Sequence, residues 1–433
     1  REIFRNSLDD LKTHAAGGKK KDYLYRLPWY IIIGPPGCGK TTALINSGLK
    51  FPLAEKYGQH KIQGVGGTRY CDWWFGEDAI LLDTAGRYST QDSNEQTDRA
   101  AWDNFLGLLK KHRPRRPVNG IILAVSLSEL LQSEAAIRTE MAVRLRQRLQ
   151  ELRKTLGIQY PVYLMFTKLD LISGAVEFFG RYDKEDRKQV FGFTYPYETV
   201  VASPGHVVEA FDSEFGLLSD SLDNRLVDHL QEERDGERRE QTYAFTKQFT
   251  SLQPLLKEFI AEVFSPSRYE ATLNLRGIYF SSGTQEGRPI DRIRARIFQL
   301  FQLAGGGVKT FAGQGRSYFL ERLFREVLFP EAGLAGTDLK VDRRNLWIRR
   351  GIFAAIGLIA VLWMIGWVVN YAYHQHYVDQ VNQQLVELNR SAGELRGDSA
   401  DMKSTLQLLD AARQIPGAEK TPSVPFWRGM GLF

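Results

Sequence analysis

The sequence predicts an α/β protein with a mainly parallel, doubly wound sheet, followed by one membrane-spanning helix. Short apolar runs alternate with helical stretches at residues 30–34, 69–75, 79–83, 120–126, 162–167 and 275–281. A glycine-rich loop stands between the first of these runs and the helical stretch after it. Much later, residues 351–373 carry no Asp, Glu, Lys or Arg. Alternating strands and helices are typical of parallel sheets with helices on both faces.

The bulk composition indicates more than one domain. The 433 residues exceed the usual size of a single hydrophobic core. A net charge of +6 is small for this length, so the positions of the basic residues must decide what they contact. Two cysteines, Cys38 and Cys71, cannot make a disulfide framework and indicate a reducing compartment. The sequence starts at Arg1 rather than Met, and we expect a piece of a longer protein.

The loop after the first apolar run fits the phosphate-binding pattern Gly-x-x-x-x-Gly-Lys-Ser/Thr in the strand–loop–helix setting that it requires. Its glycines let backbone N–H groups turn toward phosphates, and the following helix N-terminus adds partial positive charge. Lys40 is expected to reach the β- and γ-phosphates, and the Thr41 hydroxyl to ligate Mg²⁺. The residues expected to contact the nucleotide here are Gly34, Gly37, Cys38, Gly39, Lys40, Thr41 and Thr42.

A second motif, Asp83-Thr-Ala-Gly86, ends the apolar run 79–83. Asp83 suits the Mg²⁺ side of a nucleotide, and Gly86 offers a bare N–H near a γ-phosphate. The run 69–75 and the turn 76–78 predict a hairpin with this strand, which adds an antiparallel edge. Just ahead of the hairpin, Thr68 is either a switch residue that meets Mg²⁺ and γ-phosphate or a plain loop residue.

Arg87 stands where small GTPases carry the Gln that orients the attacking water. An arginine can stabilise developing charge but cannot align water, so intrinsic hydrolysis should be slow or should need a partner. The expected catalytic residues are Lys40, Thr68, Asp83 and Arg87, and the expected Mg²⁺ ligands are Thr41, Thr68 and Asp83.

The third motif, Thr167-Lys168-Leu169-Asp170, follows an apolar run and resembles the loop with which GTPase domains read guanine. Asp170 would accept hydrogen bonds from the guanine ring N–H and amino group. Ser281 and Ser282, after the run 275–281, are expected at the edge of the base. In parallel sheets the carboxyl ends of the strands share one edge, so these motifs should meet. The fold class is therefore P-loop GTPase-like, with Mg²⁺ and either ATP or GTP as ligand.

Ser126 and Glu129 form a capping-box pattern that opens a long amphipathic helix. Its inward side chains are expected to be Leu127, Leu131, Ala135, Leu145, Leu149 and Leu152.

The charge-free segment 351–373 is long enough, at about 1.5 Å per residue, to cross the roughly 30 Å hydrocarbon core of a bilayer. Five basic residues precede it and none follows before Arg390. The positive-inside rule then places residues 1–346 in the cytoplasm and 374–433 outside, which is the periplasm in a Gram-negative cell.

Two basic runs, 19–21 and 110–116, lack interleaved aromatic residues. We interpret them as solvated connections or contacts with inner-leaflet lipid rather than nucleic-acid sites.

Three stretches carry a resemblance to the IcmF/TssM family, the inner-membrane component of type VI secretion systems: residues 27–42, 64–88 and 317–336. The resemblance covers nearly the whole chain and implies a GTPase-like cytoplasmic domain with a helical insertion. It also implies an oligomeric envelope complex containing a DotU/TssL-type inner-membrane protein. A TssJ-type outer-membrane lipoprotein would bind a periplasmic region beyond this chain, and the baseplate would lie on the cytoplasmic side.

The expected organisation is an N-terminal cytoplasmic helix and linker (1–26), a P-loop GTPase-like domain (27–170 and 273–300), a helical insertion (171–272) without a strand pattern, a helical region leading to the membrane (301–346), a transmembrane helix (347–373) and the start of a periplasmic helical region (374–433).

Two classes of function follow from these features. The first is a structural anchor of the bacterial inner membrane, with a nucleotide-binding switch domain and at most weak NTPase activity. The alternative is an energising ATPase or GTPase that powers secretion assembly, or a membrane GTPase of protein targeting.

Overall fold

The structure, a computed structural model of the whole chain, describes residues 23–51, 71–86, 95–203, 205–283, 286–287, 311–312, 316–336, 339–394, 402–413 and 415. The chain divides into two compact units, residues 1–342 and 343–433, which are described separately.

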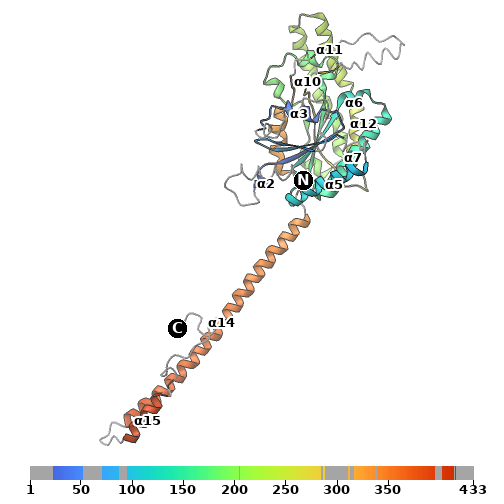
Figure 1. Cartoon of the computed structure of the whole chain (residues 1–433). Helices are drawn as coiled ribbons and strands as arrows, with labels where there is room; N and C mark the ends of the chain where they lie inside the picture. Colours follow the sequence, from blue (N-terminus) through green and yellow to red (C-terminus); the bar gives the residue numbers. More distant parts are fainter. Residues whose placement is uncertain are drawn as a thin grey trace. The chain divides into compact units, whose positions relative to one another are not determined.

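The first unit is built on a central sheet (Figure 1). This sheet has seven strands in the order β2-β3-β1-β4-β5-β7-β6. Its strands are β1 (Trp29–Ile33), β2 (Cys71–Phe75), β3 (Ile80–Thr84), β4 (Gly120–Ser126), β5 (Pro161–Thr167), β6 (Gly192–Thr194) and β7 (Asn274–Phe280). The five central strands are parallel, whereas β2 and β6 pair antiparallel at the two edges. The predicted mainly parallel sheet and its antiparallel hairpin are confirmed. A separate two-stranded ladder joins β8 (Glu286–Gly287) to β9 (Phe311–Ala312).

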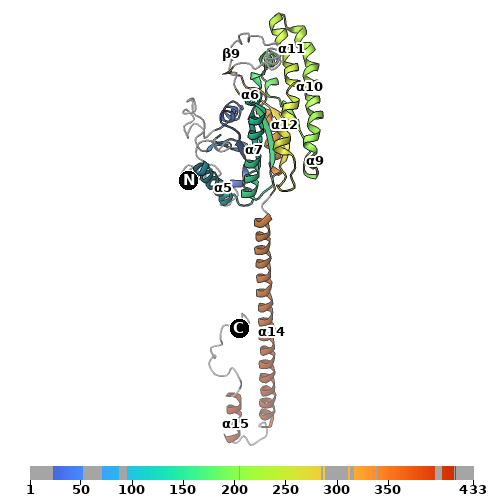
Figure 2. The same ribbon diagram turned by 90° about the vertical axis from the view of Figure 1, so that its right-hand side faces the viewer.

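Helices cover both faces of this sheet (Figure 2). The helices of this unit within the described residues are α2 (Tyr23–Arg26), α3 (Lys40–Ile45), α5 (Glu95–His112), α6 (Leu127–Gln132), α7 (Ala135–Leu156), α8 (Ala175–Phe179), α9 (Tyr197–Ala202), α10 (His206–Glu232), α11 (Gly236–Thr250) and α12 (Gln253–Phe264). Short helical turns are η2 (Leu169–Leu171), η3 (Asp186–Lys188), η4 (Leu323–Leu328) and η5 (Pro330–Gly333).

The side chains of β1 show how the two faces differ. Trp29, Ile31 and Ile33 belong to a core that includes α5, α7 and α12. Tyr30 and Ile32 point to the other face, where they share a core with α3 and the segment 320–328. Because central parallel strands are buried on both faces, their sequences read as continuous apolar runs, which is why the sequence predicts them well.

Two local predictions were wrong. The single long helix after Ser126 is interrupted: α6 ends before Ser133, whose ψ of 146° is extended, and α7 begins at Ala135. The predicted cap holds, since Ser126 accepts a hydrogen bond from the Glu129 N–H, but Ala135 is exposed rather than inward. The stretch 171–272 also contains a strand, β6, whose three residues are too few to show a period in the sequence.

The last part of the segment 316–336, residues 331–336, contacts the edge of the sheet where the parallel strands begin, here called the amino edge. Glu331 accepts hydrogen bonds from the Tyr163 hydroxyl at 2.8 Å and from the Arg276 Nε at 3.0 Å. Asn119 donates to the Ala332 carbonyl at 2.8 Å, and the Gly336 N–H donates to the Gln159 carbonyl at 2.7 Å. These bonds fasten the segment to strands β4, β5 and β7 or to residues beside them.

Helix α14 (Leu339–Glu394) contains the apolar segment, and α15 (Met402–Arg413) follows it. Its span Leu346–Gly393 is long and apolar enough to cross a membrane, and none of its most apolar window is buried. Large apolar side chains such as Phe353, Leu362 and Val368 are exposed along it. Among the described residues, the predicted membrane helix is thus confirmed as one long apolar helix.

Candidate functional site

The glycine-rich loop lies between β1 and α3, at the carboxyl edge of the sheet. Gly37 and Gly39 have φ values of +72° and +90°, a left-handed conformation that favours glycine. Helix α3 starts at Lys40, so the backbone N–H groups of its first turn have no partners within the helix. Pro35 and Pro36 supply no N–H, which leaves the donors of the loop concentrated from Gly37 onward.

Lys40 is 6% exposed, and its ammonium group is held by the loop itself. Nζ donates to the Gly34 carbonyl at 2.9 Å and to the Pro35 carbonyl at 3.0 Å. Cys38 is also buried, and burial raises the pKa of its thiol. The loop therefore positions one cation and no reactive thiolate.

Thr41 and Asp83 come together from α3 and the end of β3. The Thr41 hydroxyl donates to the Asp83 carboxylate. Gly86 lies against the loop, because a Cβ built on it would be 2.4 Å from the Pro36 Cα. The structure thus brings the Asp83–Gly86 motif onto the glycine-rich loop, as the sequence predicts.

The third motif closes the opposite side of the loop. The Thr167 hydroxyl donates to the Cys38 carbonyl. Asp170 is buried and accepts a hydrogen bond from the Ser282 hydroxyl. Ser281 is fixed by its N–H, which donates to the Phe166 carbonyl at 2.8 Å. The structure therefore places Asp170, Ser281 and Ser282 side by side, while Thr42 contacts the loop after β7 at Gly283.

Thr68 and Arg87 lie outside the described residues, so their expected roles as switch and catalytic residues stay predictions.

Two carboxyl groups at this site have raised pKa values. Burial raises the pKa of Asp170 to about 6, against the lowering influence of the Ser282 hydrogen bond. Burial also raises the pKa of Glu129, while Lys168 and Lys40 act in the opposite direction. The Glu129 carboxylate is 4.0 Å from the Lys168 ammonium and 3.8 Å from a Cβ built on Gly37.

Sequence reasoning missed Glu129 as a site residue, since the capping-box pattern accounted for it. Its position three residues after β4 could have indicated this, because the carboxyl end of β4 lies at the same edge of the sheet.

A triphosphate bound by this loop would be repelled by the Glu129 carboxylate. Glu129→Gln should therefore raise triphosphate affinity by about threefold to tenfold at low salt, and less at high salt. Titration calorimetry of the full chain in detergent measures the change. Glu232→Gln, on a side chain of α10 that is 72% exposed, is the matched control and should leave affinity unchanged. An equal change in both variants would contradict a local effect.

The residues present fit Mg²⁺ and a nucleoside triphosphate. Thr41 and Asp83 provide adjoining hard oxygen donors, which Mg²⁺ prefers. Among the described residues, no group of three or more His, Cys, Asp and Glu side chains forms a metal cage. Two protein oxygens suit Mg²⁺, which is usually held by one or two carboxylates together with phosphates and water.

Comparison with known proteins gives three findings. The family model for the IcmF-related N-terminal domain matches residues 95–356. The chain is 47% identical over 424 residues to the type VI secretion system component TssM1 of Pseudomonas aeruginosa, covering 98% of this chain and 38% of that protein. The chain therefore spans less than half the length of this relative.

A solved structure of the signal recognition particle receptor SRb-GTP/SRX complex from Chaetomium thermophilum shows 20% identity and a TM-score of 0.23. It covers 41% of this chain and 86% of that one.

Proposed function

The chain belongs to the IcmF-related family, and from this premise we propose that it is a membrane-anchored structural component of a type VI secretion envelope complex that carries a nucleotide-binding switch domain. The family membership and the apolar helix α14 support the anchor. The switch rests on the site at the carboxyl edge of the sheet.

One observation carries the nucleotide proposal. Three loops, which follow β1, β3 and β5, converge with the residues after β7 on the same edge of the sheet. Lys40 would turn from the loop carbonyls to the phosphates, and Thr41 with Asp83 would hold Mg²⁺. Mg²⁺ would neutralise phosphate charge when bound. Asp170 would accept hydrogen bonds from the base.

We propose a nucleotide-dependent switch rather than an energising NTPase for two reasons. Arg87 replaces the water-orienting Gln, which supports hydrolysis that is slow or dependent on a partner. The second reason is that the Thr167–Asp170 loop is linked by hydrogen bonds, through Ser282, to the segment that precedes the membrane helix. Ser282, which bonds Asp170, exchanges backbone hydrogen bonds with Tyr318 at 2.9 and 3.2 Å. Tyr318 opens the segment that reaches Glu331 and then α14.

The family resemblance supports the proposed surroundings. Residues 1–346 would be cytoplasmic and 374–433 periplasmic, in an oligomeric complex of the bacterial inner membrane. The proposed partners are a DotU/TssL-type inner-membrane protein, the baseplate and, beyond this chain, a TssJ-type lipoprotein.

The identity of the base is tested by pH. Guanine donates two hydrogen bonds and needs Asp170 as a carboxylate, whose pKa is raised to about 6. At pH 5 only about one such group in eleven is ionised. GTP affinity should therefore fall about tenfold more than ATP affinity between pH 7.5 and pH 5. ATP is the reference because its phosphates are protonated over the same pH range. Parallel titrations of the two nucleotides measure this difference.

Asp170→Asn is the matching variant. Its amide accepts from a ring N–H and donates to a carbonyl, so preference should move from GTP to XTP and the excess pH dependence should vanish. If the unmodified chain prefers ATP, or if Asp170→Asn leaves the preference unchanged, the guanine role of this loop is wrong.

A further inference from the structure

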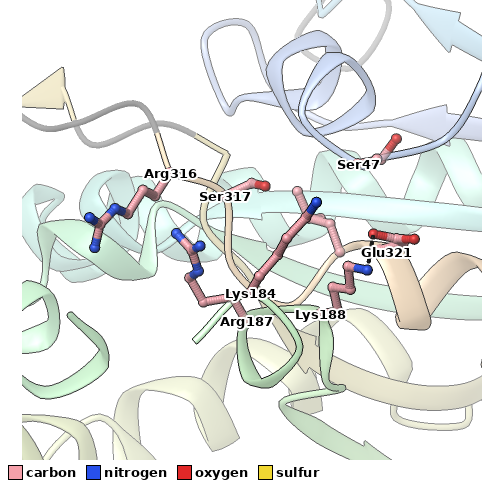
Figure 3. A pocket seen from close by; sticks show the side chains of 9 residues that line it. Ser47, Lys184, Arg187, Lys188, Arg316, Ser317 and Glu321 are labelled. Atoms are coloured by element: carbon pink, nitrogen blue, oxygen red, sulfur yellow. Dashed lines mark ion pairs between the residues drawn. The ribbon is translucent and has the colours of Figure 1, made fainter. Parts of the chain in front are cut away.

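A cavity of about 320 Å³ lies where three segments that are distant in sequence meet (Figure 3). Ser47 and Gly48 follow α3, and Lys184, Arg187 and Lys188 lie in or beside η3. The third segment, residues 316–321, contributes Arg316, Ser317 and Glu321. Its volume falls within the roughly 300–1,000 Å³ typical of small-molecule sites.

The lining carries four basic side chains and one carboxylate. Lys188 has acidic partners, Glu185 at 2.8 Å and Glu321 at 3.7 Å. Glu321 is also shared with Arg325 at 3.8 Å. Within the described part of the chain, the other three cations, Lys184, Arg187 and Arg316, have no ion pair.

These three cations line the cavity. Arg187 donates from Nε to the Asp183 carbonyl at 3.1 Å, and Arg316 donates from Nη1 to the Gly180 carbonyl at 3.5 Å. Figure 3 shows the Lys184 ammonium group extended toward Ser47, and Arg187 and Arg316 among the side chains that line the cavity. Like charges that line one cavity repel one another. An anion that enters the cavity would offset this repulsion and lower the free energy of the protein.

The backbone holds the cationic segments together. The Phe319 N–H donates to the Arg187 carbonyl at 2.7 Å, which ties η3 to the segment 316–321. Phe319 has a φ of +63°, a strained conformation for a residue other than glycine, and it is buried among Phe179, Tyr182 and Phe191. Strained residues of this kind persist where the surroundings fix them, and they are frequent at ligand sites.

We propose that this cavity is a binding site for a small phosphate-bearing anion. Three cations without an ion pair among the described residues match a multiply charged oxyanion better than a single carboxylate. Guanidinium groups bind phosphate oxygens with paired N–H donors, and Lys184 adds a point charge. The Ser317 hydroxyl, which has no hydrogen bond to another described residue, supplies a further donor. The proposal is independent of nucleotide binding at the Gly34–Thr41 loop.

The probe is pyrophosphate, and the full chain in detergent is tested by equilibrium dialysis at constant ionic strength without Mg²⁺. The measurement uses the Lys40→Ala background, so that the glycine-rich loop contributes little. One pyrophosphate should bind per chain. The double variant Arg187→Gln/Arg316→Gln should lower its affinity at least tenfold and should raise the thermal midpoint in phosphate-free buffer, because it relieves repulsion.

The matched control is Arg144→Gln/Lys257→Gln, which removes two surface cations that do have acidic partners, Glu140 and Asp212. It should leave pyrophosphate affinity unchanged and should not raise the thermal midpoint. Ser317→Asp is a second test that keeps every cation, because its carboxylate competes with the anion and should also weaken binding at least tenfold.

Three results would overturn the proposal. The first is no pyrophosphate binding in the Lys40→Ala background. The second is unchanged affinity in both cavity variants. The third is that chloride, at the same ionic strength, raises the thermal midpoint of the chain as much as pyrophosphate does.

Discussion

Glu331→Ala should lower the free energy of unfolding of the sheet domain by about 3 kcal/mol, because it leaves the Arg276 guanidinium without its carboxylate. The two side chains are only 19% and 13% exposed. Glu331 also accepts the Tyr163 hydrogen bond, so one substitution removes partners from two strands. Breaking a buried pair costs about 3–5 kcal/mol, and the partial exposure of this pair places it at the lower end. Urea unfolding of the full chain in detergent measures the change.

Glu326→Ala is the matched control in the same segment. Its carboxylate is 60% exposed and lies 3.5 Å from Arg322, so the loss should be below about 1 kcal/mol. Equal losses in the two variants would show that the Glu331 bonds do not fasten the segment 316–336 to the sheet.

Lys40→Ala should weaken nucleoside triphosphate binding by tenfold or more, which corresponds to at least about 1.4 kcal/mol. Lys40 supplies the only side-chain charge within the Gly34–Thr41 loop, and a charged hydrogen bond to phosphate is among the strongest available. Calorimetric titration of the full chain with GTP and ATP measures the loss.

Lys50→Ala is the control for overall charge, since Lys50 is exposed and follows α3. It should bind as the unmodified chain does. Because Lys40 also satisfies two loop carbonyls, circular dichroism has to confirm that Lys40→Ala remains folded. A folded Lys40→Ala variant with unchanged affinity would mean that this loop does not bind phosphate.

The sequence predicted those parts of the site whose chemistry is local. The Gly34–Thr41 loop needs its glycines and its lysine within eight residues, and the pattern is visible without the fold. Asp83 lies near the end of β3, and Asp170 and Ser282 follow β5 and β7, so their common edge could be predicted from the strands, whereas their roles toward a nucleotide stay predictions. Once those strands are parallel, their carboxyl ends must share an edge.

Features made by distant segments left no sequence pattern. Glu129 resembled an ordinary capping residue, and only the fold brings it to Gly37 and Lys168. Glu331 bonds to Arg276 and Tyr163, which are 55 and 168 positions away in the sequence. The break at Ser133 was missed because apolar periodicity continues through it.

We propose that the carboxyl edge of the sheet binds a nucleoside triphosphate with Mg²⁺. It is tested most directly by titrating the unmodified full chain with fluorescent GTP and ATP and following anisotropy, first with Mg²⁺ and then with excess EDTA. The account predicts saturable binding of one nucleotide per chain that weakens when Mg²⁺ is removed. Absence of saturable binding of either nucleotide up to about 1 mM would contradict it.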